Sequence, residues 1–280
     1  MPVLCAVPLP RLTQKEFGEI SFCVMAHVFA IHRDFGRLFD ERIYKQELAQ
    51  RLPGVRLETQ VDVTHRTFTK RSFLDVLTAE GARFEFKAVE DFTPRHRAQL
   101  LNYLLLLDLA HGKLVNLRPS EVPHEFVNAA MTTAERRRFA LHRNGFDAQT
   151  PGAVALEAIF IPLLEDFGTG LDLSFYEEAV THLLGGEATV VRDVEVIGGD
   201  GTTLGTQRLR LCAPEAAFRL TTFAAPPPSF SDHCRRLLRQ LPLEAVQWIN
   251  ITNHVITLTT IRRTTKTMEL RKTRGRPSTP

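Results

Sequence analysis

The stretch 73–87 carries acidic and basic residues at a spacing that suits metal chemistry. Its two ends are rich in β-prone residues and its middle resembles a turn, so we expect a β-hairpin there. If the turn centres near Glu80, Asp75 lies opposite Glu85, with the two Cβ atoms roughly 5 Å apart. Facing carboxylates repel each other, and a hard divalent cation with oxygen ligands is the simplest group to lie between them.

Lys87 extends this pattern, because residues two apart in a strand lie on the same face. The second strand therefore presents Glu85 and Lys87 together, with Phe84 and Phe86 on the opposite face. Two acids and a lysine around a hard divalent cation would place a Lewis acid and a positively charged donor side by side. The metal would act as a Lewis acid and lower the pKa of bound water.

Two helices are expected before the hairpin. One is predicted over Thr13–Arg33, where a capping box precedes apolar residues at helical intervals. The other is predicted over Asp40–Arg51, ahead of a proline and a glycine. Glu41 and Tyr44 are three residues apart in this second helix, so they share a face.

Strands and a third helix complete the unit. Residues 55–70 alternate well enough for one or two strands, and 112–117 reads as a short buried strand. Between them, a proline in the first turn opens a helix predicted from Thr93 to about Leu109. Gln99 and Tyr103 are four residues apart in that helix and lie on one face.

The pattern restarts in the second half of the chain. Asp-Phe-Gly occurs at 34–36 and again at 166–168, and a tyrosine follows eight residues after each glycine, at Tyr44 and Tyr176. Two apolar strand segments also return at one common offset: 84–87 as 218–221, and 114–116 as 248–250. Order and spacing that persist over roughly a hundred residues favour an internal duplication over chance similarity.

The second copy keeps the apolar scaffold and loses the chemistry. The site residues are replaced in the second copy. Leu173 stands at the position of Glu41, Arg219 at that of Glu85 and Thr221 at that of Lys87. The segment that matches Asp75 contains no acid. A scaffold role alone would not explain the loss of all of them, so the divergence favours a functional role in the first half.

The arrangement resembles the D…ExK core of the PD-(D/E)XK nucleases. Gln99 and Tyr103 resemble the QxxxY element of the RecB-like branch of that superfamily. Glu41 and Tyr44 resemble the namesake motif of its GxxExxY family, although Leu38 stands where that family has a glycine. The resemblance covers about residues 12–128.

The resemblance implies a restriction-endonuclease-like fold, in which a central mixed sheet is flanked by helices. We therefore predict an α/β mixed-sheet architecture that is tandemly duplicated. The expected parts are a nuclease-like catalytic domain at 1–130, a linker at 131–150, a degenerate nuclease-like pseudo-domain at 151–261 and a basic disordered tail at 262–280.

The resemblance also implies roles for the site residues. Asp75 and Glu85 would hold Mg²⁺ or Mn²⁺, with the Phe86 carbonyl as a further ligand. Lys87 would orient the attacking water or offset charge in the transition state. Glu41 would ligate the metal directly or through water. The residues expected to position the substrate or the metal ligands are Gln99 and Tyr103.

The net charge of +3 is unevenly distributed. From Arg262 onward there are seven basic residues and one acidic residue, so this tail carries +6 and the rest of the chain sums to −3. A basic tail on a near-neutral body indicates a polyanion partner. Arg-Gly-Arg-Pro in the tail resembles an AT-hook, whose arginines enter a narrow A·T minor groove. The residues expected to contact nucleic acid are Arg271, Lys272, Arg274 and Arg276.

The composition is ordinary for a soluble globular protein, with 44% hydrophobic and 24% charged residues. The longest apolar run, 104–110, is interrupted by Asp108 and is too short to cross a bilayer. The N-terminus shows no signal-peptide pattern, and the four cysteines have no zinc-site spacing. We expect a cytoplasmic protein with no membrane partner.

These observations predict a Mg²⁺-dependent nuclease acting on DNA, whose second half packs beside the first as an intramolecular pseudo-dimer and widens the nucleic-acid surface. Two alternatives stay open: a non-catalytic nucleic-acid-binding or scaffold protein, and a nuclease acting on RNA. The single residues also have ordinary explanations, since Asp75 and Glu85 would be unremarkable on an exposed strand. Glu41 would likewise be unremarkable as the partner of Lys45 at i,i+4.

Overall fold

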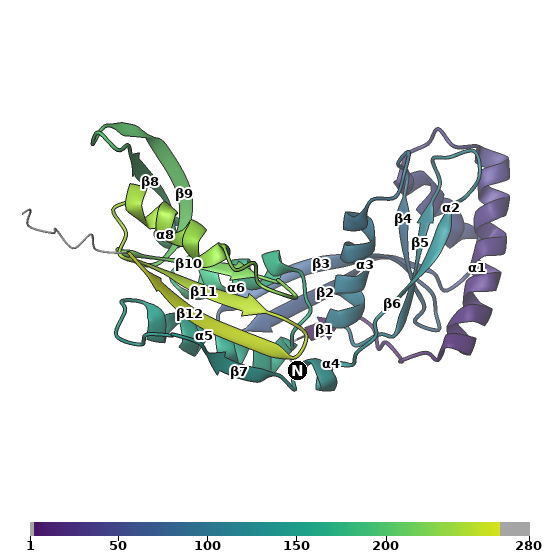
Figure 1. Ribbon diagram of the computed structural model, residues 1–280. Coiled ribbons are helices and arrows are strands. Elements are labelled where there is room, and N and C mark those ends of the chain that lie inside the picture. The colour runs from purple at the N-terminus through teal and green to yellow at the C-terminus, as the bar shows by residue number, and fades with distance from the viewer. Residues whose placement is uncertain (1–2, 264–280) are drawn as a thin grey trace, which may run out of the picture.

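The computed structural model describes residues 3–263, which form two similar halves (Figure 1). The first half runs from the first strand to the sixth. Its elements are β1 (Val3–Cys5), α1 (Gln14–Phe35), α2 (Glu41–Arg51), β2 (Arg56–His65), β3 (Phe68–Leu77), β4 (Arg83–Lys87), α3 (Pro94–Leu106), β5 (His111–Asn116) and β6 (His124–Asn128). The strands form one sheet in the order β1-β2-β3-β4-β5-β6.

The second half has a similar order of elements after a short connection, but it contains one additional short helix, and its first strand pairs with its last strand. The connection contains α4 (Thr133–Arg136). The elements that follow are β7 (Ala140–Arg143), α5 (Ala153–Phe167), α6 (Leu173–Leu183), α7 (Glu187–Val190), β8 (Val191–Ile197), β9 (Thr203–Ala213), β10 (Ala216–Thr221), α8 (Phe230–Gln240), β11 (Ala245–Ile251) and β12 (Val255–Arg262). Their sheet has the order β7-β12-β11-β10-β9-β8.

Both sheets are mixed, and one parallel pair in each corresponds, whereas the second sheet has a further parallel pair, β7 with β12. In the first sheet β4 and β5 are parallel, and α3 connects them. In the second sheet β10 and β11 are parallel, and α8 connects them. A parallel pair needs such a crossover, because a two-residue turn can join only antiparallel strands.

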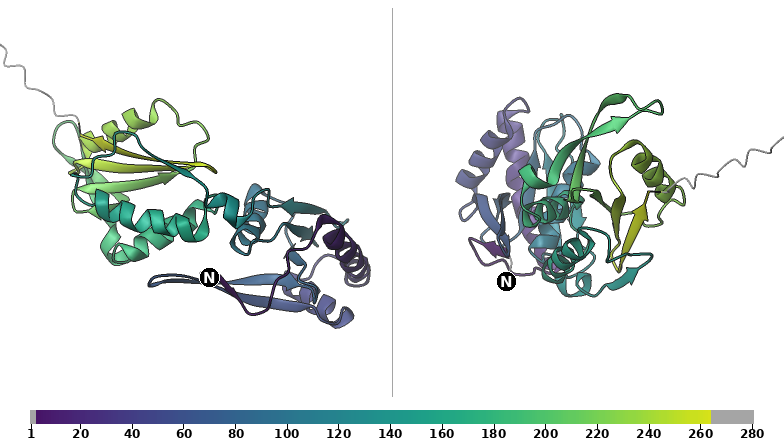
Figure 2. Two further views of the ribbon diagram at one scale, coloured as in Figure 1. Left: turned by 90° about the horizontal axis from the view of Figure 1, so that it is seen from below. Right: turned by 90° about the vertical axis from the view of Figure 1, so that its left-hand side faces the viewer.

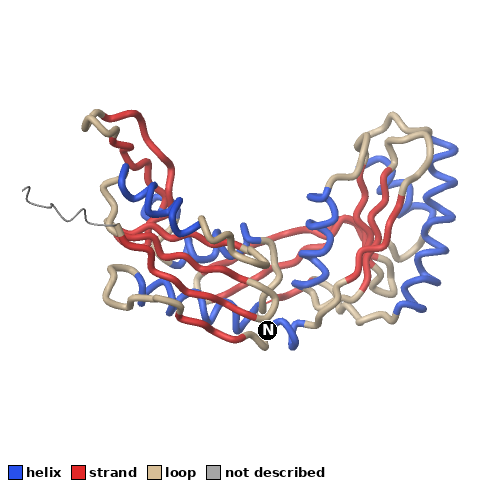
Figure 3. Tube along the Cα trace, in the orientation of Figure 1, coloured by secondary structure: helices blue, strands red, loops and turns tan. Residues whose placement is uncertain are grey.

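Helices cover both faces of each sheet (Figure 3). In the first half, Phe84 and Phe86 pack with α1 and α2, whereas Leu114 on the neighbouring strand packs with α3. In the second half, Phe218 packs with α5 and α6, whereas Ala217 packs with α8. The alternation of side chains along β4 and β10 thus separates two apolar layers in each half.

The expected helices and the expected hairpin are present. The helix predicted over Thr13–Arg33 is α1, and its Thr13 and Glu16 form the predicted capping box. The helix predicted over Asp40–Arg51 is α2, which begins at Glu41 although Leu38 replaces a glycine before it. Leu38 is not among the residues with positive φ, so its backbone conformation is open to any side chain.

The expected boundaries of the connecting segments differ from the structure. Residues 131–150 were expected to be a linker, but β7 within them pairs with β12, and Arg136 is almost fully buried. Arg136 donates hydrogen bonds to the backbone carbonyl oxygens of Leu105, Phe167 and Thr169, which joins the two halves. The tail was expected from residue 262, but Arg262 belongs to β12; residues 264–280 lie outside the described part of the chain.

The two halves share one core. The β2–β3 hairpin extends from the first half along the second, as the view from below shows (Figure 2, left). At its tip, the ring of Phe68 lies 5.9 Å from the ring of Phe175 in α6, and Lys70 forms an ion pair with Glu178. The apolar layer beneath α3 is therefore continuous with the layer formed by α5 and α6.

The halves pack through unlike faces. The first half contributes the α3 face of its sheet, whereas the second half contributes the α5–α6 face of its own. The α8 face of the second half corresponds to the α3 face by element order, and it packs as a separate apolar cluster. Among residues 3–263, no helix is both long and apolar enough to span a membrane.

Candidate active site

The β3–β4 hairpin brings Asp75 and Glu85 together. Val76 pairs with Phe84, and the same register continued by one residue places Asp75 opposite Glu85. The Asp75 carboxylate also accepts a hydrogen bond from the backbone N–H of Phe86 at 3.2 Å. The predicted juxtaposition of the two acids is therefore present, and the Phe86 backbone lies beside them.

Glu85 is buried, and its carboxylate is paired with two positively charged side chains. Its side chain is 1% exposed. Arg83 lies 2.6 Å from one carboxylate oxygen and Lys87 lies 2.8 Å from the other. Burial raises the pKa of Glu85, and the charges of Arg83 and Lys87 oppose this shift. The Lys87 ammonium is also 3.7 Å from Asp75, so it bridges the two acids.

Helix α2 adds a third acid and a second lysine. The Lys45 ammonium lies 3.1 Å from Glu41 and 3.3 Å from Asp75. It also lies 2.6 Å from Glu58 on β2, and its side chain is only 7% exposed. The i,i+4 pair of Glu41 and Lys45 is thus part of the site. Burial and the charge of Asp75 raise the pKa of Glu41.

The turn before α2 fixes the position of these side chains. The Tyr44 hydroxyl donates a hydrogen bond to the Gly36 carbonyl oxygen at 2.8 Å and accepts one from the Phe39 N–H at 3.2 Å. Gly36 has φ +69°, which favours glycine. Tyr44 is fully buried, so the turn is held between the end of α1 and the start of α2.

Glu58 has an unusual backbone conformation near the start of β2. Its φ is +49°, in the left-handed region that side-chain-bearing residues rarely adopt. Such strain persists only where surrounding contacts impose it, and it gathers at functional sites. Here the ion pair with Lys45 holds the side chain toward Asp75, its neighbour by the register of β2 and β3.

Together these seven residues form what we call the charge cluster: Glu41, Lys45, Glu58, Asp75, Arg83, Glu85 and Lys87. The sequence analysis missed three of them as site residues. Lys45 was considered only as a surface partner of Glu41. Arg83 could have been found, because it lies two residues before Glu85 and shares its face. Glu58 carried no recognisable signal, because its role depends on strand register and an unusual φ.

The charge cluster contains the donors that a hard divalent cation prefers. Its four acids offer carboxylate oxygens, the ligand type of Mg²⁺. The donor chemistry therefore fits the expected metal. Within residues 3–263, however, no three acids, histidines or cysteines are already arranged around a common metal position. The ammonium groups of Lys45 and Lys87 lie between the acids, so cation binding would require these lysines to move aside.

A cleft gives access to one side of the charge cluster. It has a volume of about 700 Å³ and is lined by Glu41, Lys45 and Glu58. Arg42 and Arg118 lie on the same cleft wall. Guanidinium groups bind phosphate oxygens in bidentate geometry, so these two arginines are suited to a phosphodiester substrate.

The expected QxxxY pair lies farther away. The Arg83 guanidinium carbon is 4.3 Å from the centre of the Tyr103 ring, so Tyr103 reaches Glu85 only through Arg83. Gln99 and Tyr103 both line a cavity of about 310 Å³ between α3 and the second half, together with Lys70. Gln99 makes no hydrogen bond with the charge cluster among the described residues.

The second half preserves the frame of the site. The Tyr176 hydroxyl donates to the Gly168 carbonyl oxygen at 2.7 Å and accepts from the Leu171 N–H at 3.2 Å, as Tyr44 does in its own turn. Asn250 bonds both backbone groups of Phe223. Asn116 bonds both backbone groups of Val89 in the same way.

Site positions differ between the halves. Thr221 pairs with Asn250 as Lys87 pairs with Asn116. Arg219 pairs with Trp248 across β10 and β11. The expected tail contacts, Arg271, Lys272, Arg274 and Arg276, lie outside the described residues.

Residues 18–127 match the family model of the PD-(D/E)XK nuclease superfamily. The match runs from within α1 to β6 and includes every residue of the charge cluster. Members of this superfamily are generally nucleases that use divalent metals, and the mixed sheets of this chain are consistent with their fold. No curated protein and no solved structure shows significant similarity to the chain.

Proposed function

We propose that the first half is a Mg²⁺- or Mn²⁺-dependent nuclease that hydrolyses phosphodiester bonds in DNA. One observation carries this proposal: Asp75, Glu85, Lys87 and Glu41 converge in one cluster inside the region that matches the nuclease superfamily. Phosphodiester hydrolysis needs oxygen ligands for a metal and a cation near the attacking water, and the cluster offers both.

In this mechanism the chain binds and orients the reacting groups. Asp75 and Glu85 would hold the metal, and the Phe86 carbonyl and Glu41 would be further ligands. The bound metal supplies Lewis acidity and a lowered pKa for water. Contact with Glu85 raises the pKa of Lys87 despite its burial, so Lys87 stays protonated at neutral pH. Its ammonium group can donate to the water and balance charge as the phosphorus–oxygen bond forms.

The remaining residues orient the acids or the substrate. Lys45 would have to give up its contacts with Asp75 and Glu41 for these acids to hold a metal, and it could keep its contact with Glu58 at the edge of the cleft. Tyr103 keeps Arg83 against Glu85, which orients one carboxylate oxygen. Gln99 faces the cavity between the halves, where it contacts substrate rather than metal.

We also propose that the two halves arose by duplication and that the first belongs to the GxxExxY family. The similar order of elements supports duplication. So do the hydrogen bonds that recur in both halves, from a tyrosine to a glycine carbonyl oxygen and between an asparagine side chain and the backbone. The Tyr44 hydrogen bonds give a physical reason for a tyrosine three residues after Glu41. The second half then acts as an intramolecular pseudo-copy that enlarges the nucleic-acid surface, assisted by the basic tail.

A non-catalytic nucleic-acid-binding protein is the second candidate. Lys45, Lys87 and Arg83 together neutralise most of the acidic charge in the cluster, and a protein that never binds metal would need such neutralisation. This candidate predicts DNA binding with no metal-dependent cleavage.

Cleavage of supercoiled plasmid distinguishes the two candidates. We expect wild-type protein to nick plasmid with Mg²⁺ or Mn²⁺ and to lose this activity in EDTA. Glu85→Gln and Lys87→Met should abolish cleavage, whereas Lys15→Met, at an exposed lysine of α1, serves as a matched control. Binding of DNA without cleavage by wild type would favour the second candidate, and cleavage of RNA alone would change the substrate.

A further inference from the structure

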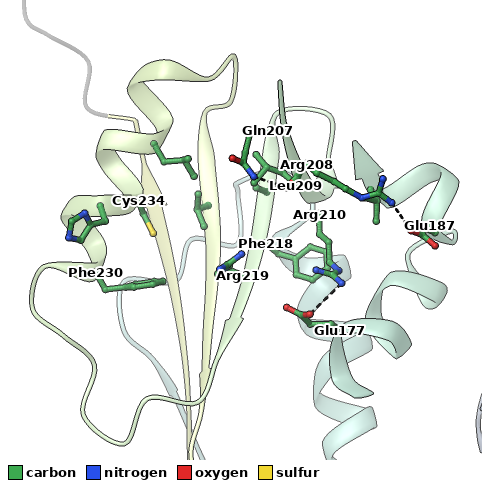
Figure 4. Close-up of a pocket in the computed structure, with 15 residues that line it drawn as sticks. Glu177, Glu187, Gln207, Arg208, Leu209, Arg210, Phe218, Arg219, Phe230 and Cys234 are labelled. Atoms are coloured by element: carbon green, nitrogen blue, oxygen red, sulfur yellow. Dashed lines mark hydrogen bonds and ion pairs between the residues drawn. The ribbon is translucent and has the colours of Figure 1, made fainter. Parts of the chain in front are cut away.

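The second half contains an open cavity where the first half has its filled site. We call it the arginine cavity. Its volume is about 500 Å³, and it lies between α8 and β9, with Arg208, Arg210 and Arg219 in its wall. Figure 4 shows Phe230 and Cys234 on one side and Glu177 and Glu187 on the other. This volume falls in the range of small-molecule binding sites.

The arginine cavity exists because two bulky residues of the first half have small counterparts. At the common offset of β4 and β10, Ala217 corresponds to Arg83, which is fully buried in the first half. Leu237 corresponds to Tyr103, whose ring packs on Arg83. Both replacements remove side-chain volume from the same face of the sheet, and Ala217 and Leu237 both line the resulting space.

The charge at the position that corresponds to Glu85 is reversed in the second half. Arg219 occupies the position of Glu85, is exposed toward the cavity and makes no ion pair with residues 3–263. Arg210 is 3.3 Å from Glu177, and its Nε is buried without a hydrogen-bond partner. Arg208 pairs with Glu187, but both side chains are mostly exposed. Exposed pairs of this kind contribute little free energy, so the arginine can exchange its partner for a phosphate.

An aromatic surface borders the same arginines. Phe230 lines the cavity, and its ring centre lies 4.5 Å from that of Trp248. Trp248 pairs directly with Arg219 in the sheet and is the single tryptophan of the chain. Apolar walls are completed by Leu209, Phe218 and Val246. Aromatic rings beside cationic groups are the usual platform for an unpaired base and its phosphate.

We propose that the arginine cavity binds one nucleotide of a single-stranded nucleic acid, with its phosphate at Arg219 and its base against Phe230. The inference rests on the proposed function for the nature of the ligand, because it takes nucleic acid to be the substrate. A duplex does not fit this description, since its bases are stacked and paired. In this proposal, the position that corresponds to Glu85 in the second half holds the strand on which the first half acts.

Trp248 provides a direct measurement. Its fluorescence is titrated with a short thymidine oligonucleotide in EDTA, so that cleavage cannot occur. We expect a saturable change in wild-type protein and an affinity at least about tenfold lower in Arg219→Glu, because a phosphate contact to a charged group is lost. Arg239→Glu makes the same charge change at an exposed residue of α8 outside the cavity, and it should bind within about threefold of wild type.

The possible results distinguish failure of the cavity proposal from failure of the nuclease proposal. Oligonucleotide binding by anisotropy without any change in Trp248 fluorescence would place the strand elsewhere and overturn the inference, as would equal weakening by both variants. Thymidine monophosphate binding as tightly as the oligonucleotide would make the ligand a free nucleotide, which also overturns it. Glu85→Gln should keep the fluorescence response. If wild type binds in this way but never cleaves DNA, the nuclease proposal fails while the cavity assignment holds.

Discussion

At the scale of single residues, the charge cluster is balanced by lysines. Lys45 contacts Glu41, Glu58 and Asp75, and its pKa is raised because these three acids outweigh the effect of burial. In the proposed function, a metal ion would compete with this lysine for the same oxygens. The contacts that stabilise the metal-free protein would then have to separate before a metal binds.

Replacing Lys45 with methionine tests this competition. We expect Lys45→Met to lower the thermal stability of metal-free protein, because three acids lose a shared cation. The same change should tighten Mn²⁺ binding, measured by calorimetry, and make the melting temperature depend strongly on Mn²⁺. Lys15→Met, which alters an exposed lysine, should leave both quantities unchanged. Weaker Mn²⁺ binding in Lys45→Met would show that the lysine does not occupy the metal position.

The raised pKa values of Glu41 and Glu85 predict how activity depends on pH. Both carboxyl groups must be ionised to bind a cation, so cleavage should fall on the acid side at a pH above 4.5, the ordinary glutamate value. Raised folded-state pKa values favour the protonated form, so these two groups stabilise the fold at low pH and lose that contribution as the pH rises through them. The loss of activity should thus precede any loss of circular dichroism signal. At a metal concentration well below saturation, where the free protein's carboxyl groups set the profile, an acid limb at or below 4.5 would contradict the assignment.

At the scale of elements, the turn between the two helices of each pair, α1–α2 and α5–α6, fixes the start of the second helix. Tyr44 and Tyr176 make the same two hydrogen bonds, and both are fully buried. In the first half this turn fixes the start of α2, which carries Glu41 and Lys45. In the second half it fixes α6, which carries Glu177. The repeated tyrosine was visible in the sequence, but its bonding partners were not.

The two tyrosines form a matched pair of variants. Tyr176→Phe should lower the free energy of unfolding by about 1–3 kcal/mol, because a buried carbonyl oxygen and a buried N–H lose their partner. Tyr44→Phe should lower it less, by about 0.5–1.5 kcal/mol, because Gly36 and Phe39 are exposed and water can replace the hydroxyl. Only Tyr44→Phe should also reduce metal-dependent cleavage, since only that turn positions Glu41. Chemical denaturation and plasmid cleavage measure the two effects. Equal loss of activity in both variants would indicate that stability alone limits cleavage.

Sequence patterns predicted where the helices and strands lie better than they predicted which charged side chains meet. The hairpin that places Asp75 opposite Glu85 followed from β-propensity and a turn signal, both of which are local. The burial of Lys45 could not be predicted, because it depends on how α2 crosses β2 and β3. The contact between Glu58 and Lys45 needed tertiary structure as well, since its φ of +49° contradicts the ordinary strand pattern.

At the scale of the whole molecule, the halves are joined through unlike faces. Such head-to-tail packing does not close on itself, in contrast to a two-fold dimer. It covers the α3 face of the first half and leaves the α8 face of the second half with its own cluster and the arginine cavity. The repeat in the sequence predicted two units, but the faces that meet are decided by the length of the β2–β3 hairpin and by the buried Arg136.

The tip of that hairpin should therefore be essential to the stability of both halves. Phe68 is 5% exposed and contacts Phe175 and His182 of α6, so Phe68→Ala leaves a cavity in the shared core. We expect a loss of about 3–5 kcal/mol in the free energy of unfolding, measured with urea. Phe22→Ala, at a ring that is 79% exposed on α1, should change it by less than about 0.5 kcal/mol. Because the core is continuous, Trp248 fluorescence in the second half should report the destabilisation caused by Phe68 in the first. Unchanged Trp248 unfolding in Phe68→Ala would mean that the halves fold independently.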